Sequence, residues 1–243
     1  MYRIAVFLVI LVLSLFQFGC QNAEMERLTQ EKSELQQQFK DLVAEHEELK
    51  SEHEQLRDEV APMKEIKERI DFLAGQLEGI TVTIKTNHGE MELELFPDKA
   101  PIHVFNFVAR AESGYYDGLK FHRIIENFMI QGGDPDTRSD DRGDYGSGGP
   151  VFNIPHEFND ISHQPGVLSM ARVADKTQGA GSQFFIMHGE APRLDGEYTA
   201  FGQLISGTET LESIATTETY GSDSEYRDQP VDHVIIEQIT VSK

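Results

Sequence analysis

The sequence of 243 residues has one cysteine, Cys20, and no tryptophan. A lone cysteine excludes a disulfide bond within the chain. Basic residues are also few, because 21 Lys and Arg residues accompany 42 Asp and Glu residues and give a formal net charge of −21. Such a chain repels the phosphate backbone of nucleic acids and the headgroups of anionic lipids. We therefore expect no nucleic-acid partner, and any membrane attachment must depend on a hydrophobic anchor.

The sequence also lacks the motifs of several metal, nucleotide and nucleophile sites. The acidic segment 134–144 has neither the residue order of an EF-hand nor its terminal glutamate. The glycine-rich segment 146–149 lacks the Lys-Ser/Thr ending of a phosphate-binding loop, and Ser147 and Ser182 lack the context of a nucleophile elbow. No metal-ligand spacing relates four of the histidines, His88, His156, His163 and His188. We therefore expect no metal and no other cofactor.

The first twenty residues have the features of an export signal. Arg3 is followed by an apolar run over 4–15, which is shorter than the roughly 18–20 residues that a membrane-spanning helix needs. A small residue directly before Cys20 resembles the lipobox of bacterial lipoproteins, although Gln17 stands where leucine is usual. We predict a lipoprotein-type signal peptide over 1–19 and lipidation of Cys20. An uncleaved short anchor and plain secretion are the alternatives. The predicted location is the periplasm-facing side of a bacterial cell envelope.

A heptad repeat follows this segment. Every seventh residue over 28–77 is apolar, which is the spacing of coiled-coil d positions, whereas half of the matching a positions are polar. The pattern allows a self-associating coil, as a dimer or trimer, or a single solvated helix. Pro62 is expected to break or kink the helix, because it removes a backbone donor and clashes with the preceding turn. We predict an acidic helical spacer over 20–78, broken near Pro62, with homo-oligomerisation possible through 24–78.

From Ile80 onward the apolar residues recur at the spacing of β-strands. They alternate with polar residues over 80–85 and over 90–95, and Asn87-His-Gly89 between these segments supplies turn residues, so we predict a hairpin. Short strands and glycine-rich turns follow, up to a final strand over 234–241. Many strands with few helices favour a closed antiparallel barrel over 79–243, because closure removes exposed sheet edges.

Two helices are predicted within this domain. Pro101 is typical of a first helical position, and the helix should end near Gly114. A second helix is expected over 208–216. We expect the inward-facing apolar stripe of the first helix to consist of Ile102, Phe105, Val108 and Ala109. Phe107 lies outside this stripe.

Residues 121–134 carry the most informative pattern. One cation, Arg123, stands among Phe121, Phe128 and Met129, with the amide of Gln131 close behind. This mixture suits a substrate that is apolar and uncharged yet needs one strong hydrogen-bond donor, such as a prolyl peptide bond. A second block over 182–187 adds apolar residues and another glutamine.

From about Thr81 to Ser242 the chain resembles the cyclophilin family of peptidyl-prolyl cis–trans isomerases. Five motifs in the order and at about the spacing of that family carry the resemblance: Phe121-His-Arg123, Phe128-Met-Ile-Gln-Gly-Gly-Asp134, Pro165-Gly-Val-Leu-Ser-Met-Ala171, Ser182-Gln-Phe-Phe185, and Leu194-Asp-Gly196 followed by Phe201-Gly202. The resemblance implies a mainly β fold, a closed eight-stranded antiparallel barrel capped by two helices. Here the helical coiled-coil arm would precede it.

The resemblance also implies roles for individual residues. Arg123 and Gln131 would be catalytic, because a guanidinium can donate to the proline nitrogen only while the amide is twisted. Gln131 and Gln183 would hold the substrate carbonyl and orient the arginine, while His122 is expected to be structural. The other expected substrate-binding residues are Phe128, Met129, Phe185 and Leu194 around the proline ring, the backbone of Ala171 and Arg172, and Tyr198 as a flat wall.

Two residues differ from the eukaryotic members of the family. Arg193 precedes Leu194 where those members have tryptophan, and Tyr198 replaces a histidine. Both changes resemble bacterial cyclophilins and imply weak cyclosporin binding. The resemblance implies an isomerase that acts on proline-containing unfolded or flexible polypeptides and needs no cofactor, because no bond is made or broken. The N-terminal segment adds the expectation that these polypeptides are exported and that the enzyme is attached to the membrane through a lipid on Cys20. The alternative is a non-catalytic peptide-binding scaffold or chaperone tethered to the envelope.

Overall fold

The computed structural model describes the backbone of residues 2–221 and 223–243, and the side chains from residue 24 onward within these ranges. The chain divides into two compact units, Met1–Glu65 and Ile66–Lys243. The lipidation predicted at Cys20 concerns a side chain outside the described part. Over the part that the structure describes, no helix combines the length and apolar character needed to cross a membrane.

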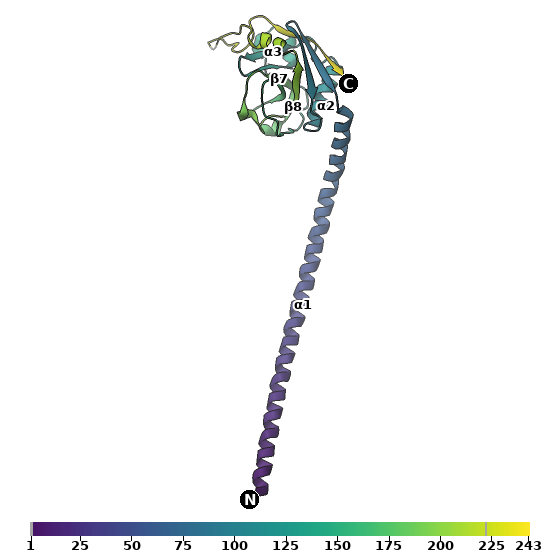
Figure 1. Ribbon diagram of the computed structural model, residues 1–243, viewed down its shortest axis with the longest axis vertical. Coiled ribbons are helices and arrows are strands. Elements are labelled where there is room, and N and C mark those ends of the chain that lie inside the picture. Colours follow the sequence, from purple (N-terminus) through teal and green to yellow (C-terminus); the bar gives the residue numbers. More distant parts are fainter. Residues whose placement is uncertain (1, 222) are drawn as a thin grey trace. The chain divides into compact units, whose positions relative to one another are not determined.

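Helix α1 (Tyr2–Leu77) contains the heptad repeat and continues through Pro62 (Figure 1). The predicted break at Pro62 is therefore not found. Proline removes the donor that would bond the carbonyl of Asp58. This part of the helix is exposed to solvent, so water can satisfy that carbonyl instead.

The last turns of α1 belong to the second compact unit. Leu77 is buried and Leu73 packs against the same apolar core, while Lys243 Nζ donates a hydrogen bond of 2.9 Å to the carbonyl of Gln76. Gly79 follows with φ of 75°, a left-handed conformation that suits glycine at the end of a helix. The unit thus begins about a dozen residues before the predicted domain boundary at 78/79.

The described residues of this unit form a sheet of nine strands in the order β3-β9-β1-β2-β8-β6-β7-β5-β4, with every neighbouring pair antiparallel. The predicted hairpin is present as β1 and β2, the first two strands along the chain. The nine strands are β1 (Thr81–Thr86), β2 (Gly89–Leu95), β3 (Lys120–Phe121), β4 (Arg123–Ile125), β5 (Met129–Gly132), β6 (Val167–Arg172), β7 (Ala180–Met187), β8 (Ala200–Ser206) and β9 (Val234–Ser242).

The two strands at the ends of this order, β3 and β4, are joined by a single residue, His122. The chain itself therefore closes the sheet into a barrel, and the N–H of His122 donates to the carbonyl of Gln131 at 3.0 Å. The prediction of eight strands was wrong in number. Segment 120–125 is divided at His122, because its first part pairs with β9 and its second part pairs with β5.

Two α-helices accompany the barrel, α2 (Pro101–Glu112) and α3 (Thr208–Ala215) (Figure 1). The inward face of α2 is formed by Val104, Phe107, Val108 and Ala111. The predicted stripe was wrong except for Val108, and Phe105 is 51% exposed. The correct face follows the i, i+3, i+4, i+7 spacing, whereas the other apolar residues lie about one position away around the helix. Short 3₁₀ turns occupy Pro135–Arg138, Arg142–Asp144, Lys176–Gln178 and Pro192–Leu194.

Alternation along the central strands separates the main core from the outer face. Ile130 and Phe184 point into the main core, whereas their neighbours Met129 and Phe185 belong to a smaller apolar cluster. The other residues of this smaller cluster come from β6, β7, β8 and the segment between β7 and β8: Val167, Met187, Ala191, Leu194 and Ala200. Strands β5 and β7 thereby place apolar side chains beneath the outer face of the barrel.

Candidate active site

A cavity of about 140 Å³ lies over this smaller cluster. Strands β4, β5, β6 and β7 and the segment 194–198 contribute its walls. The structure brings together nine of the ten residues predicted for catalysis or substrate binding: Arg123, Phe128, Met129, Gln131, Ala171, Arg172, Phe185, Leu194 and Tyr198. The tenth, Gln183, lines a neighbouring cavity of about 440 Å³ that shares Gln131, Ala171 and Arg172 with the first.

The floor of the smaller cavity is apolar and fixed by aromatic contacts. Met129, Phe185 and Leu194 are buried, and the ring of Tyr198 meets Phe185 edge-on, with 5.7 Å between the ring centroids. On its other side Phe185 stacks on His163, with an angle of 22° between the planes. A flat, apolar surface of this kind suits a small apolar ring.

His163 is a supporting residue that the sequence did not reveal. Its Nδ1 lies 2.9 Å from Asp195 Oδ1, and its Nε2 lies 3.1 Å from Ser169 Oγ. Burial lowers the pKa of His163, and the backbone N–H of His163 helps to lower the pKa of Asp195. These contacts hold the loop that carries Leu194 and Tyr198. No motif marks His163, because its partner Asp195 lies 32 residues further along the chain.

Two arginines line the cavity, and their surroundings differ. Arg172 Nε donates to the carbonyl of Glu197 at 2.9 Å, and the guanidinium lies 4.5 Å from the centre of the Tyr198 ring, so this side chain is engaged in the wall. Arg123 is 43% exposed, and its Nε lies 3.7 Å from Asp228 Oδ2. It makes no other polar contact within the described residues. Arg123 therefore has donors available at the mouth of the cavity.

The position of Arg123 follows from a tight hairpin. Strands β4 and β5 pair Arg123 with Gln131, and Asn127 in the intervening turn has φ of 59°, a conformation that asparagine tolerates well. The carbonyl of Asp228 accepts a hydrogen bond of 2.8 Å from the N–H of Ile124. The segment around Asp228 thus supports β4 from the side opposite to β5, a contact that no sequence motif indicated.

The neighbouring His122 is buried and uncharged. Burial lowers its pKa to about 4, and neither ring nitrogen has a hydrogen-bond partner of good geometry in the described part of the chain. At neutral pH the ring therefore adds no second charge beside Arg123. This placement agrees with the structural role expected for His122.

The two predicted glutamines have different surroundings. Gln131 Nε2 donates to Gln183 Oε1 at 2.9 Å, and Gln183 Nε2 donates to the carbonyls of Gly146 and Gly148 at 3.1 and 2.8 Å. Both hydrogens of the Gln183 amide are used in this way. Gln183 therefore positions Gln131, whose Oε1 accepts no hydrogen bond from any described residue.

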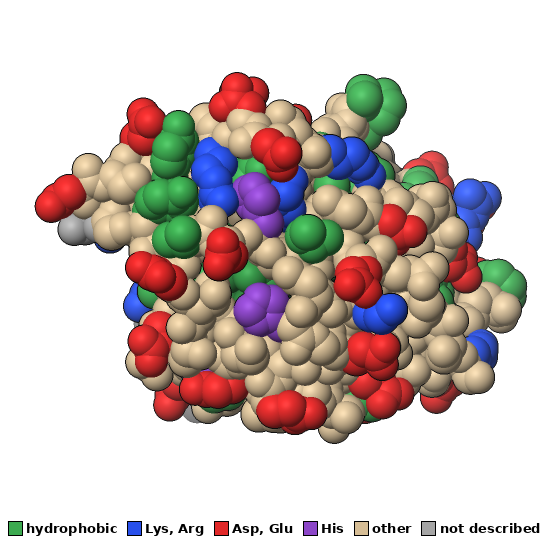
Figure 2. Space-filling view, turned by 90° about the horizontal axis from the view of Figure 1, so that it is seen from above, with side chains coloured by type: hydrophobic (Ala, Val, Ile, Leu, Met, Phe, Trp, Pro, Cys, Tyr) green, Lys and Arg blue, Asp and Glu red, His purple; other side chains and the backbone are tan. Residues whose placement is uncertain are grey.

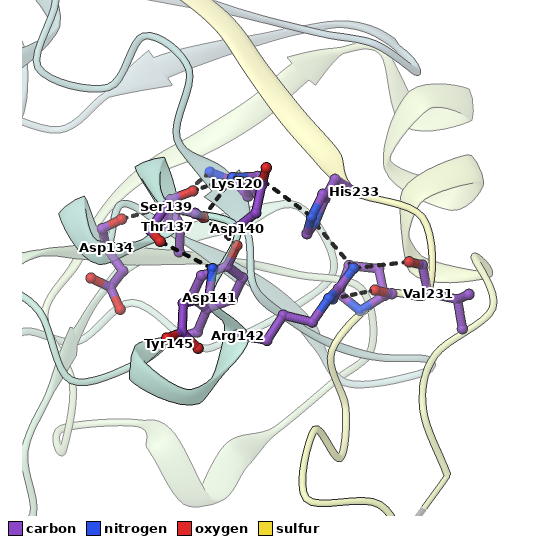
Figure 3. Close-up of polar contacts among 11 residues, drawn as sticks. Lys120, Asp134, Thr137, Ser139, Asp140, Asp141, Arg142, Tyr145, Val231 and His233 are labelled. Atoms are coloured by element: carbon purple, nitrogen blue, oxygen red, sulfur yellow. Dashed lines mark hydrogen bonds and ion pairs between the residues drawn. The ribbon is translucent and has the colours of Figure 1, made fainter.

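The loop that supplies Gly146 and Gly148 is anchored on both sides. The buried carboxylate of Asp134 accepts hydrogen bonds from the N–H groups of Asp136 and Gly146. Figure 3 shows Lys120 directed at the carbonyls of Thr137 and Ser139, and Arg142 directed at Val231. Residues 134–149 are therefore held to β3 and to the segment before β9.

Arg193 also has a place in the site. Its guanidinium carbon lies 4.6 Å from the centre of the Phe128 ring, a distance that allows a cation–π interaction. Arg193 thus covers the aromatic wall at the position where eukaryotic members of the family have a tryptophan.

The domain as a whole is acidic, whereas the two charged residues that line the cavity are arginines, Arg123 and Arg172. From Gly79 onward 26 acidic and 12 basic residues occur, and Figure 2 shows acidic side chains spread over the face that it displays. An anionic ligand would be repelled by this field. Among the described residues no three His, Cys, Asp or Glu side chains cluster so as to hold a metal ion.

Comparison with known proteins gives one consistent result. Residues 81–241 match the family model described as cyclophilin type peptidyl-prolyl cis-trans isomerase/CLD. Peptidyl-prolyl cis-trans isomerase CYP18-1 of Arabidopsis thaliana is 40% identical over 164 residues, which cover 67% of this chain and 96% of the relative. Peptidyl-prolyl cis-trans isomerase-like 2 of Cryptococcus neoformans is 42% identical over 161 residues, but this chain spans only 27% of that longer relative.

A solved structure has the same fold. The cyclophilin type peptidyl-prolyl cis-trans isomerase of Cryptosporidium parvum, determined in the presence of the dipeptide Ala-Pro, is 36% identical in sequence and superposes with a TM-score of 0.59. The match covers 67% of this chain and 99% of that structure. The part that matches is the barrel, and the helical arm lies outside it.

Proposed function

This chain belongs to the cyclophilin-type peptidyl-prolyl cis–trans isomerases, and we propose that Arg123 carries its catalysis. The isomerase accelerates rotation about X–Pro bonds. The observation that carries the assignment to Arg123 is its partly exposed guanidinium at the mouth of an apolar cavity, beside Phe128, Met129 and Phe185.

The chemistry requires one donor that acts during rotation. Rotation about a peptide bond breaks amide resonance and has a barrier of about 18–20 kcal/mol. In the twisted state the proline nitrogen becomes pyramidal and regains a lone pair. A hydrogen bond from Arg123 to this lone pair exists only in the twisted state, and such an interaction lowers the barrier. A stabilisation of about 5–6 kcal/mol corresponds to a rate increase of roughly 10⁴-fold.

The remaining residues position the substrate. The proline ring packs on Met129, Phe185 and Leu194, while Gln131 and the backbone of Ala171 and Arg172 bind the polar groups of the peptide. The uncharged floor and the free donors of Arg123 support a proline-containing peptide as ligand. The Cryptosporidium parvum protein, whose structure was determined in the presence of Ala-Pro, supports the same ligand class.

The cellular role is a further part of the proposal. Export and lipidation at Cys20 would place the isomerase on the periplasm-facing side of a bacterial envelope, where it would assist the folding of exported proteins. The cationic start, the short apolar run and the lone cysteine support this role. The segment 20–78 would then be a spacer between the membrane and the barrel.

Exchange spectroscopy on an Ala-Pro peptide tests the assignment of Arg123. We expect Arg123→Ala to lower the rate of cis–trans interconversion at least about 100-fold, a loss typical of removing a donor that acts in the transition state. Arg27→Ala, on the exposed part of α1, is the matched control and should keep the rate of the unchanged protein. Equal, accelerated rates for all three proteins would contradict the role of Arg123. Rates no higher than that of the peptide alone, with binding retained, would support a non-catalytic peptide-binding scaffold instead.

A further inference from the structure

Helix α1 presents an uncovered apolar stripe within residues 24–65. The leucines at every seventh position, including Leu28, Leu35 and Leu56, are between 56% and 69% exposed. An exposed apolar stripe of this extent indicates a binding surface. We propose that a second copy of this chain covers it, aligned parallel and in register as a two-stranded coiled coil. This inference is independent of catalysis at Arg123.

The charges beside the stripe are sorted by sign. With the leucines at position d of the heptad, position g of residues 24–65 holds no basic residue and position e holds no acidic residue. The residues at g are Glu24, Glu31, Gln38, Glu45, Glu52 and Glu59, and those at e are Thr29, Gln36, Val43, Lys50, Arg57 and Lys64. Positions e and g flank the seam of a coiled coil and set the choice and orientation of the partner.

This distribution fits a parallel pair in register. In that arrangement each g residue faces the e residue five positions later in the other copy. Glu45 then meets Lys50 of the second copy, and Glu52 meets Arg57. Glu59 likewise meets Lys64, and the two-fold symmetry repeats each pair. An antiparallel pair would bring g against g and e against e, so that like charges face one another and destabilise the coil.

The acidic residues at g are available for such pairs. Glu45, Glu52 and Glu59 are exposed, and no ion pair to them occurs in the part of the chain that the structure describes. Lys50 is exposed too and forms no ion pair there. These four side chains are therefore not already engaged along their own helix, whereas Arg57 lies 3.8 Å from Asp58 in an exposed pair that exchange of partners can replace.

The seam residues favour two strands over three. Leucine occupies d in five successive heptads, and position a includes the polar residues Lys32, His46 and His53. Isoleucine at d shifts the preference to three or four strands, and no d position of residues 24–65 holds isoleucine. Polar residues at a fix the register at a loss of stability. Pro62 falls at position c, on the outer side of the coil, so the continuous helix carries it without disturbing the seam.

A parallel coil has a consequence for catalysis. Both chains leave the coil at the same end, so each assembly carries two isomerase units there. A client with several prolyl bonds can then engage both units, which raises the apparent affinity without any new contact.

Exchange of the charges tests the pairing. In the full chain in detergent micelles, we expect the triple variants Glu45→Lys/Glu52→Lys/Glu59→Lys and Lys50→Glu/Arg57→Glu/Lys64→Glu each to self-associate at least about tenfold more weakly than the unchanged chain. An equimolar mixture of the two should associate again, because opposite charges then face across the seam. Unchanged isomerase rates per chain would show that the barrel remains folded. If each variant alone associates as strongly as the equimolar mixture does, the proposal is overturned.

Disulfide cross-linking tests the orientation. In a full-length Cys20→Ser background, Leu35→Cys and Leu56→Cys should each cross-link to itself under oxidation, whereas Ser51→Cys at the outer f position should not. Only a parallel coil in register brings both d positions against their own copies. Cross-linking at neither position, or at one position alone, would overturn the proposed alignment.

Discussion

Gln131 Nε2 donates a hydrogen bond of 2.9 Å to Gln183 Oε1, and this contact connects the cavity that contains Arg123 to the glycine-rich loop. Gln183 is itself held by the carbonyls of Gly146 and Gly148. The orientation of Gln131 therefore depends on a loop that begins at Asp134, outside the cavity.

Removal of the Gln183 side chain should weaken catalysis without removing a substrate contact. Gln183→Ala leaves Gln131 without its acceptor, and the loss of one such hydrogen bond is about 1 kcal/mol. We expect kcat/KM to fall roughly five- to tenfold, measured by exchange spectroscopy on an Ala-Pro peptide. Gln238→Ala, on the exposed side of β9, should leave kcat/KM unchanged. A loss of the same size in both variants would contradict a specific role for Gln183.

Adjacent glycines in the loop should respond differently to alanine. A Cβ at Gly148 would overlap Asp134 Oδ1, whereas a Cβ at Gly149 would meet nothing within 4 Å. Gly148→Ala must displace the loop, and we expect the free energy of unfolding to fall by about 1–3 kcal/mol. We also expect reduced kcat/KM, because Gly148 accepts from Gln183. Gly149→Ala should match the unchanged protein in urea unfolding and activity, and equal losses in both would contradict this account.

Arg193 should influence substrate affinity more than the rate of the chemical step. Arg193→Gln removes the guanidinium from the Phe128 ring, and an exposed cation–π interaction is worth about 0.5–1 kcal/mol. We expect KM to rise about two- to fivefold with kcat nearly unchanged, measured over a series of peptide concentrations. Arg193→Lys, which keeps the charge, should have a smaller effect. A fall in kcat with constant KM would show that Arg193 acts in the transition state instead.

Stability should fall in acid because His122 is buried. Burial lowers its pKa to about 4, whereas the ordinary value is 6.5, so the unfolded chain binds a proton more readily than the folded one. The stabilising contribution is complete above pH 6.5 and is lost as the pH falls towards 4. It amounts to about 3 kcal/mol. The lowered pKa of His163 acts in the same direction.

Urea unfolding at pH 7.5 and pH 4.5 measures this dependence. His122→Leu should reduce the difference in unfolding free energy between the two pH values, even if the variant is less stable overall. His46→Gln, on the exposed part of α1, should keep the difference seen in the unchanged protein. An unchanged difference in His122→Leu would show that other groups control the acid sensitivity.

Much of the site was predictable because its residues lie in short, ordered motifs. Arg123, Phe128, Met129 and Gln131 are close in sequence, and one tight hairpin brings them together. The polar contacts of the arginines in the site were not predictable. The engagement of Arg172 with Glu197 and the support of Arg123 by Asp228 join segments that are 25 or more residues apart.

The sequence by itself determined the alternation of the β1–β2 hairpin, the heptad repeat of α1 and the order of the family motifs, because each depends on residues a few positions apart. Only the tertiary structure decided which face of α2 is buried, that His122 divides one strand into two, and that Asp134 anchors the loop behind Gln183. The physical reason is that these features depend on which distant segments return to pack and pair. Local periodicity carries no information about those contacts.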